Sequence, residues 1–353
     1  MNTNYLLMKG IGIIGCGKIS QVRHIPEYAA NPEARIVGFF DMNLERAAQL
    51  ARQYDAKSYS TLEELLADGE IEAVSVCVAN HAHASVTLAA LRAGKDVLCE
   101  KPMAISMEEC EEMVRVADEC GRILMIGQNQ RLAKAHVVAR KLIQDGWIGR
   151  PLTFRTCFGH SGPETWSVDP GKNSWFFNKN LAAMGVMADL GIHKTDLIQH
   201  LLDTRVTSVC AQITTLDKTD PEGNPISVDD NALCIYTMAN GVVGTMTASW
   251  TYYGQEDNST VIYGTRGNMR IYDTGHSIEM NIIGGERTMM DVEQIQTNEN
   301  QTKSGIIDLF IDTLEGRVEN QISGHSVLPA MRAVFAAIKS SEEGRTVVIP
   351  ENM

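Results

Sequence analysis

Short apolar runs alternate with helical segments through residues 9–130, and this alternation restricts the possible folds more than any other feature of the chain. Strands are predicted at residues 9–14, 34–40, 73–78, 97–99 and 122–126. Between them, Thr61 and Ser106 are placed to cap helices, and Gly94 and Gly121 are placed to end them. Strands separated by helices at this spacing are typical of a doubly wound parallel sheet.

A glycine-rich turn follows the first predicted strand. Its sequence is Gly15-Cys16-Gly17-Lys18-Ile19-Ser20, which matches the dinucleotide-binding fingerprint with a small residue in the third position. The first glycine permits a tight turn, and Gly17 lets the backbone approach a pyrophosphate at the N-terminus of the next helix. Glycines often mark simple turns. The prediction therefore depends on the strand before these glycines and on the acidic residue at the end of the next strand.

That acid is Asp41, which ends the second predicted strand, 24 residues after Gly17. A carboxylate in this place hydrogen-bonds the ribose hydroxyls of the adenosine and repels a 2′-phosphate. Met42 follows it, and no Arg stands beside the acid to bind such a phosphate. NAD is therefore predicted in preference to NADP, although Arg46 in the next helix weakens the preference slightly.

Polar residues follow three further strands of the predicted sheet. Asn80 comes after the strand at 73–78, Glu100-Lys101-Pro102 after the strand at 97–99, and Gln128 after the strand at 122–126. Burying a charged group inside a strand is costly, so Glu100 and Lys101 are expected at the carboxyl end of the strand. Pro102 ends the strand there, because proline has no N–H to donate to the neighbouring strand. In an open parallel sheet that edge faces the ligand crevice, and these side chains are expected to converge there.

The chain changes character after Pro151, and from residue 206 onward it is mostly β, with hairpins predicted at 233–249 and 261–272. Helices at 189–202, 306–315 and 326–339 would cover one face of this sheet, and a second subunit would cover the other. The fold class is α/β: a Rossmann dinucleotide-binding domain at 1–130, then an α+β domain at 131–353 with a large, mostly antiparallel open sheet. The second domain would bind substrate and form oligomers, with its C-terminal helix free to pack back on the first.

Four polar residues share one face of the helix predicted at 189–202. They are Asp189, His193, Asp196 and His200, spaced at i, i+4, i+7 and i+11. A solvated polar face, a metal site, and an acid–base pair in which Asp189 fixes the tautomer of His193 all fit this spacing. Periodicity alone favours the solvated face, and a single helix supplies no obvious further metal ligand.

The segment 159–181 is long, irregular and rich in aromatic residues. Its aromatic content argues against disorder, and a long loop in a compact domain is usually functional. Aromatic faces suit the C–H faces of a sugar, although packing against the core is the commoner role. By location, His160, Trp166 and Trp175 are substrate candidates, together with Arg131.

The composition excludes some classes of partner. The net charge is -13, with 44 acidic and 31 basic residues, which disfavours binding to nucleic acid or to an anionic membrane. No apolar run reaches transmembrane length, and the N-terminus lacks the features of an export signal. The 8 cysteines are scattered without a C-x-x-C pair, so we expect buried free thiols in a reducing cytoplasm, neither zinc ligands nor disulfides.

Three segments, in order, resemble the Gfo/Idh/MocA oxidoreductases, the family of glucose-fructose oxidoreductase and inositol dehydrogenase. The resemblance covers nearly the whole chain. One departure is Val78-Ala79-Asn80, where relatives usually carry Thr-Pro-Asn, and it leaves the details of that loop open. The segments are Gly12-Ile13-Ile14-Gly15-Cys16-Gly17-Lys18-Ile19-Ser20, Gly94-Lys95-Asp96-Val97-Leu98-Cys99-Glu100-Lys101-Pro102 and Asp189-Leu190-Gly191-Ile192-His193-Lys194-Thr195-Asp196.

The resemblance implies roles for individual residues. Lys101 would lie beside the nicotinamide and the reacting hydroxyl, Asp189 and His193 would face it from the second domain, and His193 would be the general base. Lys101–Pro102 would be a cis peptide as in relatives, although base rates alone favour trans. With the fingerprint residues included, the predicted cofactor contacts are Gly15, Gly17, Lys18, Ile19, Asp41, Met42, Ala79, Asn80, His83, Glu100, Lys101 and Gln128.

The predicted function is NAD-dependent oxidation of a secondary hydroxyl of a sugar, glycoside or cyclitol by a homodimer or homotetramer. No metal is expected, because Lys101 supplies the positive charge. Glycoside cleavage with catalytic use of NAD, a non-catalytic NAD-binding sensor and reduction of a small acyclic aldehyde are the alternatives. The predicted catalytic residues are Lys101, Asp189 and His193, and the predicted substrate contacts are Lys101, Arg131, His160, Trp175 and His193.

Overall fold

The computed structural model describes residues 8–285, 287–294 and 303–350, which form two compact units. The first unit comprises the described residues up to Gly127, together with Ser167–Asp169 and Lys303–Leu328. The second unit comprises the remaining described residues. None of the helices within these described ranges is both long enough and apolar enough to cross a membrane.

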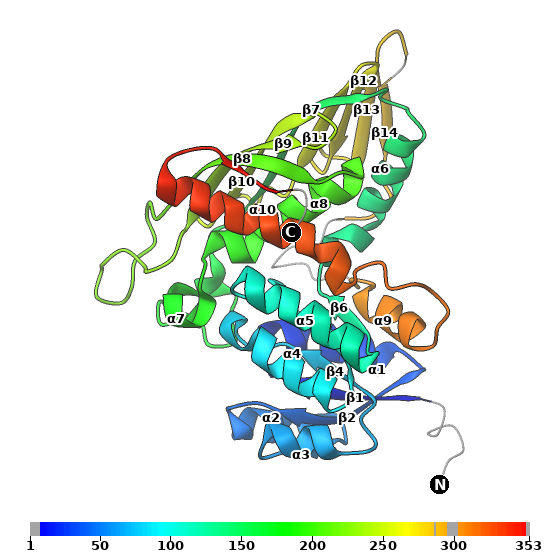
Figure 1. The fold of residues 1–353 in the computed structure, drawn as a ribbon, viewed down its shortest axis with the longest axis vertical. Coiled ribbons are helices and arrows are strands. Elements are labelled where there is room, and N and C mark those ends of the chain that lie inside the picture. Colours follow the sequence, from blue (N-terminus) through cyan, green and yellow to red (C-terminus); the bar gives the residue numbers. More distant parts are fainter. Residues whose placement is uncertain (1–7, 286, 295–302, 351–353) are drawn as a thin grey trace. The chain divides into compact units, whose positions relative to one another are not determined.

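The first unit contains a six-stranded parallel sheet in the order β3-β2-β1-β4-β5-β6 (Figure 1). This order is that of a doubly wound sheet and confirms the predicted Rossmann domain. The predicted strands are present, although β4 stops two residues early, and the two-residue β3 was not predicted. The strands are β1 Lys9–Ile14, β2 Ala34–Phe40, β3 Lys57–Ser58, β4 Ala73–Val76, β5 Asp96–Cys99 and β6 Leu124–Ile126.

The helices of this unit begin and end at the predicted capping residues. The side chain of Thr61 accepts a hydrogen bond from the backbone N–H of Glu64, and Ser106 does the same for Glu109. Gly121 ends α5 in the left-handed conformation, with φ of 59°. The helices are α1 Ile25–Ala30, α2 Leu44–Gln53, α3 Leu62–Ala67, α4 His83–Arg92, α5 Met107–Cys120 and α9 Ile306–Leu314.

The second unit contains a nine-stranded sheet in the order β14-β13-β12-β11-β7-β10-β9-β8-β15. Only β7 and β10 pair in parallel, so the sheet is mostly antiparallel as predicted, and both predicted hairpins are present. The strand β14 was not predicted. The strands are β7 Pro151–Gly159, β8 Val206–Thr214, β9 Asn231–Met238, β10 Val243–Ser249, β11 Thr260–Gly264, β12 Gly267–Ile271, β13 Ile278–Ile282, β14 Arg287–Met290 and β15 Val347–Val348.

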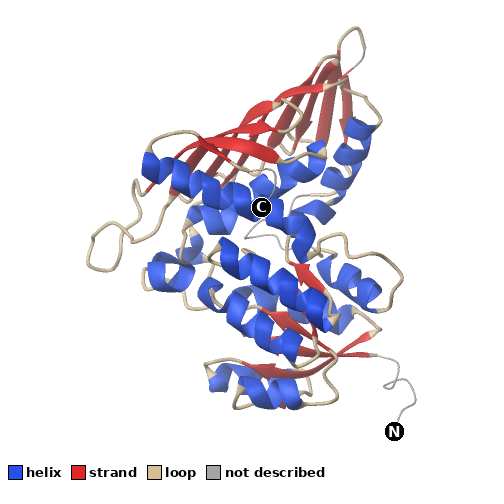
Figure 2. Ribbon diagram, viewed as in Figure 1, coloured by secondary structure: helices blue, strands red, loops and turns tan. Residues whose placement is uncertain are grey.

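Helices cover one face of this sheet (Figure 2). They are α6 Lys134–Gln144, α8 Ile192–Leu202 and the part of α10 Gly324–Glu343 that follows Leu328. Along β9, Cys234, Tyr236 and Met238 are buried, whereas Leu233 and Ile235 are exposed, so the covered and open faces alternate residue by residue. On the covered face, the hydroxyls of Thr195 in α8 and Tyr236 are 2.9 Å apart.

Two expectations about the helices were wrong. The helix α9 packs in the first unit against α1 and does not cover the large sheet. Asp308 accepts a hydrogen bond from Asn31 at 3.0 Å, and Ser304 donates its backbone N–H to Glu27 at 2.7 Å. Of the three interpretations of the polar face at 189–202, the solvated face that periodicity alone favoured is wrong, because nearly every residue of α8 is buried.

All 8 cysteines are free thiols. The expected burial is confirmed for Cys16, Cys77, Cys99, Cys110 and Cys234, whereas Cys120 and Cys157 are only half-buried. It is wrong for Cys210, which is exposed because it lies on the open face of the large sheet opposite Ile235.

Candidate active site

The turn after β1 has the geometry that dinucleotide binding requires. Gly15 has φ of +92°, and a Cβ there would lie 2.4 Å from the carbonyl oxygen of Cys77, so no larger residue fits. At Gly17, in contrast, a Cβ would meet no atom within 4 Å, which leaves open space for a phosphate beside the backbone. The hydroxyl of Ser20 donates to the carbonyl of Gly17 at 2.8 Å and fixes the turn. These residues fit an NAD pyrophosphate.

Asp41 follows β2 and is held by backbone donors. Its Oδ2 accepts from the N–H of Cys16 at 2.6 Å, and its Oδ1 accepts from the N–H of Asn43 at 2.7 Å. The acid is therefore tied to the glycine-rich turn. Arg46, the residue that weakened the NAD prediction, places its guanidinium 2.8 Å from the carboxylate of Asp169.

Lys101 follows β5, and its peptide bond to Pro102 is cis. The neighbouring loop is braced by His83, whose Nδ1 lies 2.6 Å from the carbonyl oxygen of Pro102 and whose Nε2 lies 3.1 Å from that of Val78. Burial lowers the pKa of His83. A neutral His83 can donate to only one of these two carbonyl oxygens, and a cofactor contact of His83 remains a prediction.

In the second unit, Asp189 lies on the π-helical turn Met187–Gly191, directly before α8. Its Oδ2 accepts a hydrogen bond from the indole N–H of Trp250 at 3.0 Å, and it lies 3.9 Å from Nε2 of His160. Nδ1 of His160 accepts from the N–H of Gly162, so a neutral His160 carries its proton on Nε2, toward Asp189. The structure therefore joins two of the predicted residues, Asp189 and His160.

His193 begins the first turn of α8, and its ring centroid lies 6.1 Å from that of Phe158. The ring of His160 meets the same Phe158 edge-on at 6.0 Å. The two histidines thus share one aromatic neighbour at the end of β7. That Asp189 orients His193 remains a prediction.

Arg131 was a substrate candidate, and the structure places it against Asp196. Its Nε and Nη2 lie 2.7 and 2.5 Å from the two carboxylate oxygens, and both residues are buried. This bidentate pair ties the short 3₁₀ turn after β6 to α8 and explains why Asp196 is a buried acid. The described residues contain no group of three or more His, Cys, Asp or Glu that could hold a metal ion.

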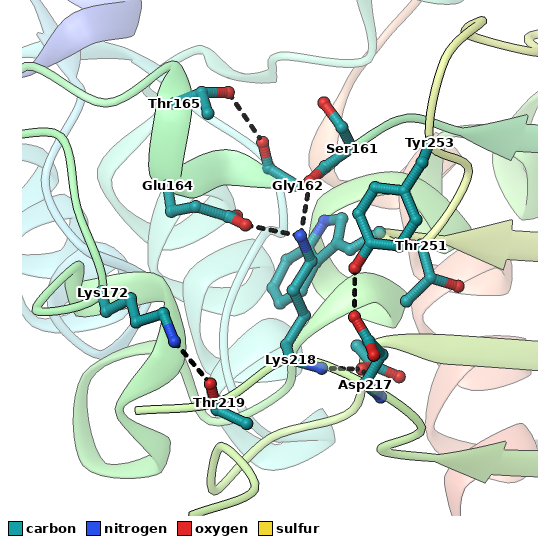
Figure 3. Close-up of polar contacts among 12 residues, drawn as sticks. Ser161, Gly162, Glu164, Thr165, Lys172, Asp217, Lys218, Thr219, Thr251 and Tyr253 are labelled. Atoms are coloured by element: carbon teal, nitrogen blue, oxygen red, sulfur yellow. Dashed lines mark hydrogen bonds and ion pairs between the residues drawn. The ribbon is translucent and has the colours of Figure 1, made fainter. Parts of the chain in front are cut away.

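A charged cluster that the sequence did not predict fixes the aromatic loop (Figure 3). The ammonium of Lys218 lies 2.5 Å from both the carbonyl oxygen of Ser161 and the carboxylate of Glu164, and 4.9 Å from the ring centroid of Tyr253. The phenol of Tyr253 donates in turn to Asp217. Farther along the loop, Phe176 and Phe177 contact the buried Trp250, with ring centroids 6.4 and 5.9 Å apart, so this part of the loop packs against the core of the unit.

Gln128 gives a further observation that fits a cofactor. It is 1% exposed, yet neither its amide oxygen nor its amide nitrogen has a hydrogen-bond partner among the described residues. A buried amide with both ends unsatisfied is costly, and a bound polar group would relieve that cost.

The predicted site residues divide between the two units, each at the end of an element. Gly15, Gly17, Lys18, Ile19, Asp41, Met42, Ala79, Asn80, His83, Glu100 and Lys101 lie in the first unit, and Gln128, Arg131, His160, Trp175, Asp189 and His193 lie in the second. Sequence reasoning missed Trp250 and Phe158 in the second unit and His24 in the first. A buried aromatic at the end of a strand is a weak signal, because most such residues are core.

Comparisons with known proteins agree with this arrangement. Residues 9–128 match the oxidoreductase family with an NAD-binding Rossmann fold, and residues 136–270 match the GFO/IDH/MocA C-terminal domain. The chain is 30% identical to levoglucosan dehydrogenase of Pseudarthrobacter phenanthrenivorans over 289 residues, which are 73% of this chain and 72% of that protein. It is 28% identical to 1,5-anhydro-D-fructose reductase of Ensifer adhaerens over 342 residues, 96% of this chain and 98% of the relative.

The fold is also that of a solved relative. Aldose-aldose oxidoreductase from Caulobacter crescentus, solved with glycerol, superposes with a TM-score of 0.83 at 25% identity, over 97% of this chain and 100% of that one. The family models and the relatives together cover both units. The chain therefore belongs to the Gfo/Idh/MocA family, as an NAD(P)-dependent dehydrogenase acting on CH–OH groups.

Proposed function

We propose that this protein oxidises a secondary hydroxyl of a sugar, glycoside or cyclitol and passes the hydride to NAD. The proposal rests on a pyrophosphate-binding turn and a strand-end Lys101 in one unit, and on the neighbouring His160 and Asp189 in the other. Levoglucosan dehydrogenase and 1,5-anhydro-D-fructose reductase, two relatives of this chain, are named for sugar derivatives, which supports the substrate class.

The chemistry requires a base and a cation at the reacting oxygen. The bound nicotinamide supplies the hydride acceptor. His193 takes the hydroxyl proton, and Asp189 supports it by fixing its orientation. Lys101 donates a hydrogen bond to the same oxygen and stabilises the negative charge that develops there. The aromatic loop with His160 and Trp175 binds the rest of the substrate.

The proposed cofactor is NAD in preference to NADP. Asp41 is held with both carboxylate oxygens fixed by backbone N–H groups, so its charge stays where a 2′-phosphate would sit. Arg46, the cation that could offset it, is paired with Asp169.

The role assignment is tested by Lys101→Met and His193→Ala on the substrate that a screen of inositols, aldoses and glycosides identifies. Each variant should lower kcat roughly 10²–10⁴-fold, because each loses a positioned group that acts only in the transition state. If both groups act on one oxygen, the double variant should be little worse than the poorer single variant. Lys141→Met and His325→Ala, which replace exposed residues, are the matched controls. Turnover within a few-fold of the parent in both site variants would refute the assignment.

The same screen separates the alternative functions. Stoichiometric NADH formation with one class of polyol supports the dehydrogenase. Release of an aglycone without net NADH would instead indicate glycoside cleavage with catalytic use of NAD. Tight NAD binding without any turnover would indicate a sensor.

We also propose that the chain forms a homodimer or homotetramer through the open face of the large sheet. The exposed apolar residues on this face are Leu233 and Ile235 of β9 and Val243 of β10. Cys210 of β8 is the strand partner of Ile235. Large apolar side chains on an open sheet face would be buried if a second copy of the chain covered that face. Free thiols throughout the chain support a reducing compartment such as the cytoplasm.

A further inference from the structure

A chain of hydrogen bonds leads from Glu100 into the core of the first unit. Oε1 of Glu100 lies 2.9 Å from Nε2 of His24, and Nδ1 of His24 lies 3.0 Å from the hydroxyl of Ser75. That hydroxyl lies 2.9 Å from the phenol of Tyr28. His24, Ser75 and Tyr28 are fully buried, and Glu100 is 4% exposed. Hydrogen bonds are strong in such low-dielectric surroundings, and an unsatisfied member would be costly.

The chemistry of the four groups gives the chain a direction. The carboxylate of Glu100 only accepts, so Nε2 of His24 must donate. Nδ1 then accepts from the Ser75 hydroxyl, whose oxygen accepts from the Tyr28 phenol, and every proton has an acceptor. With a proton on Nδ1 instead, the Ser75 oxygen would accept that proton, and either the Ser75 hydroxyl or the Tyr28 phenol would be left without an acceptor among the described contacts. The geometry therefore selects the Nε2–H tautomer of His24.

Glu100 is joined to Lys101 through its other oxygen. Oε2 accepts the backbone N–H of Lys101 at 3.1 Å, and the guanidinium of Arg23 lies 3.7 Å from Oε1. A Cβ at Gly127 would lie 3.0 Å from Oε2, so glycine leaves room for the carboxylate. Burial raises the pKa of Glu100, but the hydrogen bond from His24 and the charges of Arg23 and Lys101 outweigh it and lower the pKa to about 2. Glu100 is therefore a carboxylate throughout the working pH range.

We propose that His24 is a positioning residue for the reaction, because through Glu100 it fixes the backbone from which Lys101 reaches the substrate oxygen. The inference rests on the role of Lys101 in the proposed function. A protonated Glu100 would carry a hydroxyl in place of one acceptor oxygen, and the N–H of Lys101 would lose its fixed partner. Ser75 and Tyr28 hold the ring of His24 in the orientation that keeps this donor on Glu100.

The first experiment needs neither substrate nor activity. Nitrogen NMR of the histidine-labelled full-length protein, with the His24 signals assigned by their loss in His24→Gln, reports which ring nitrogen carries the proton. The expected result is a single Nε2–H tautomer with an unprotonated Nδ1. A proton on Nδ1, or a ring that averages between both tautomers, would overturn the proposal.

The second experiment is the pH dependence of kcat/KM. In His24→Leu the donor to Glu100 is lost while Glu100 stays buried, so the pKa of Glu100 should rise from about 2 by roughly 3–5 units into the working pH range, where its protonation should move the acid limb up by at least one pH unit. At a given pH on the acid limb, kcat/KM of His24→Leu should be about tenfold lower than that of the parent. His24→Gln, whose amide can still donate, should lie between the parent and His24→Leu. In Glu100→Gln the titrating carboxyl is absent. The double variant Glu100→Gln/His24→Leu should therefore have the same acid limb of kcat/KM as Glu100→Gln alone.

The control is Ser340→Ala, which removes a buried hydroxyl from α10 in the second unit. It should lower stability without moving the pH profile. If His24→Leu keeps the acid limb of the parent, His24 does not act through Glu100 and the proposal fails. A parent enzyme that turns over no polyol would refute the proposed function instead, and the NMR result would still decide the state of the hydrogen-bond chain.

Discussion

The contact between Trp250 and Asp189 shows how a single hydrogen bond can support the site. The indole N–H is the donor to the acid, and Trp250 is fully buried. Hydrogen bonds to charged groups contribute about 1.5–3 kcal/mol. Trp250→Phe, which removes the donor and keeps an aromatic ring, should therefore lower kcat roughly 10-fold or more with little change in NAD affinity. Steady-state kinetics and NAD titration measure both quantities.

Trp147→Phe is the matched control, because Trp147 is half exposed and lies in the same unit. If the two variants have the same kcat, the bond to Asp189 does not contribute to the reaction.

Asp41 should decide the choice between the two nicotinamide cofactors. Asp41→Ser removes the charge that repels a 2′-phosphate and one acceptor for the ribose hydroxyls. The ratio of kcat/KM for NAD to that for NADP should fall roughly 10- to 100-fold, as expected for the loss of a charged hydrogen bond. Arg46→Gln should leave NADP use unchanged, because Asp169 already pairs with Arg46. A larger effect of Arg46→Gln than of Asp41→Ser would reverse this assignment.

At the level of elements, α6 carries a buried histidine that makes the second unit sensitive to acid. Burial lowers the pKa of His136 from 6.5 to about 3, and its Nδ1 lies 2.7 Å from the carbonyl oxygen of Gln130. Between these two pKa values the unfolded chain binds a proton that the folded protein does not bind. The stability contributed by the neutral ring is therefore present above pH 6.5 and is lost as the pH falls toward 3.

His136→Asn keeps a donor for Gln130 and removes the titration. The parent should lose more free energy of unfolding than the variant between about pH 7.5 and pH 5, by up to about 2 kcal/mol. Urea denaturation at the two pH values measures the difference. An equal loss in both proteins would show that His136 does not contribute to acid sensitivity.

At the scale of the whole molecule, the open face of the large sheet should determine the oligomeric state. Ile235→Glu places a charge on the same face as the exposed Leu233 and Val243, and it should dissociate the proposed oligomer because an unpaired charge in an interface is costly. Sedimentation or light scattering measures the mass. Leu44→Glu, at an exposed apolar position in the first unit, should leave the mass unchanged. An unchanged mass in Ile235→Glu would exclude this face as the interface.

The sequence by itself determined the features that depend on local order. The periodicity of apolar residues located most strands of both sheets, but not β3 or β14. The capping residues Thr61, Ser106 and Gly121 located helix ends, and the turn at Gly15 with Asp41 identified a dinucleotide-binding domain. These signals are readable because each lies within one element or between neighbouring elements. The family resemblance then supplied Lys101, Asp189 and His193 as the proposed catalytic residues.

The tertiary structure alone decided which elements and side chains meet across long separations. It assigned α9 to the first unit, because an apolar helix face does not specify which sheet it will cover. It brought His24 to Glu100 across 76 residues and Trp250 to Asp189 across 61. It also buried the polar residues of α8, which their spacing alone had predicted to be solvated. Each of these contacts depends on chain packing in three dimensions, and no periodicity in the sequence records it.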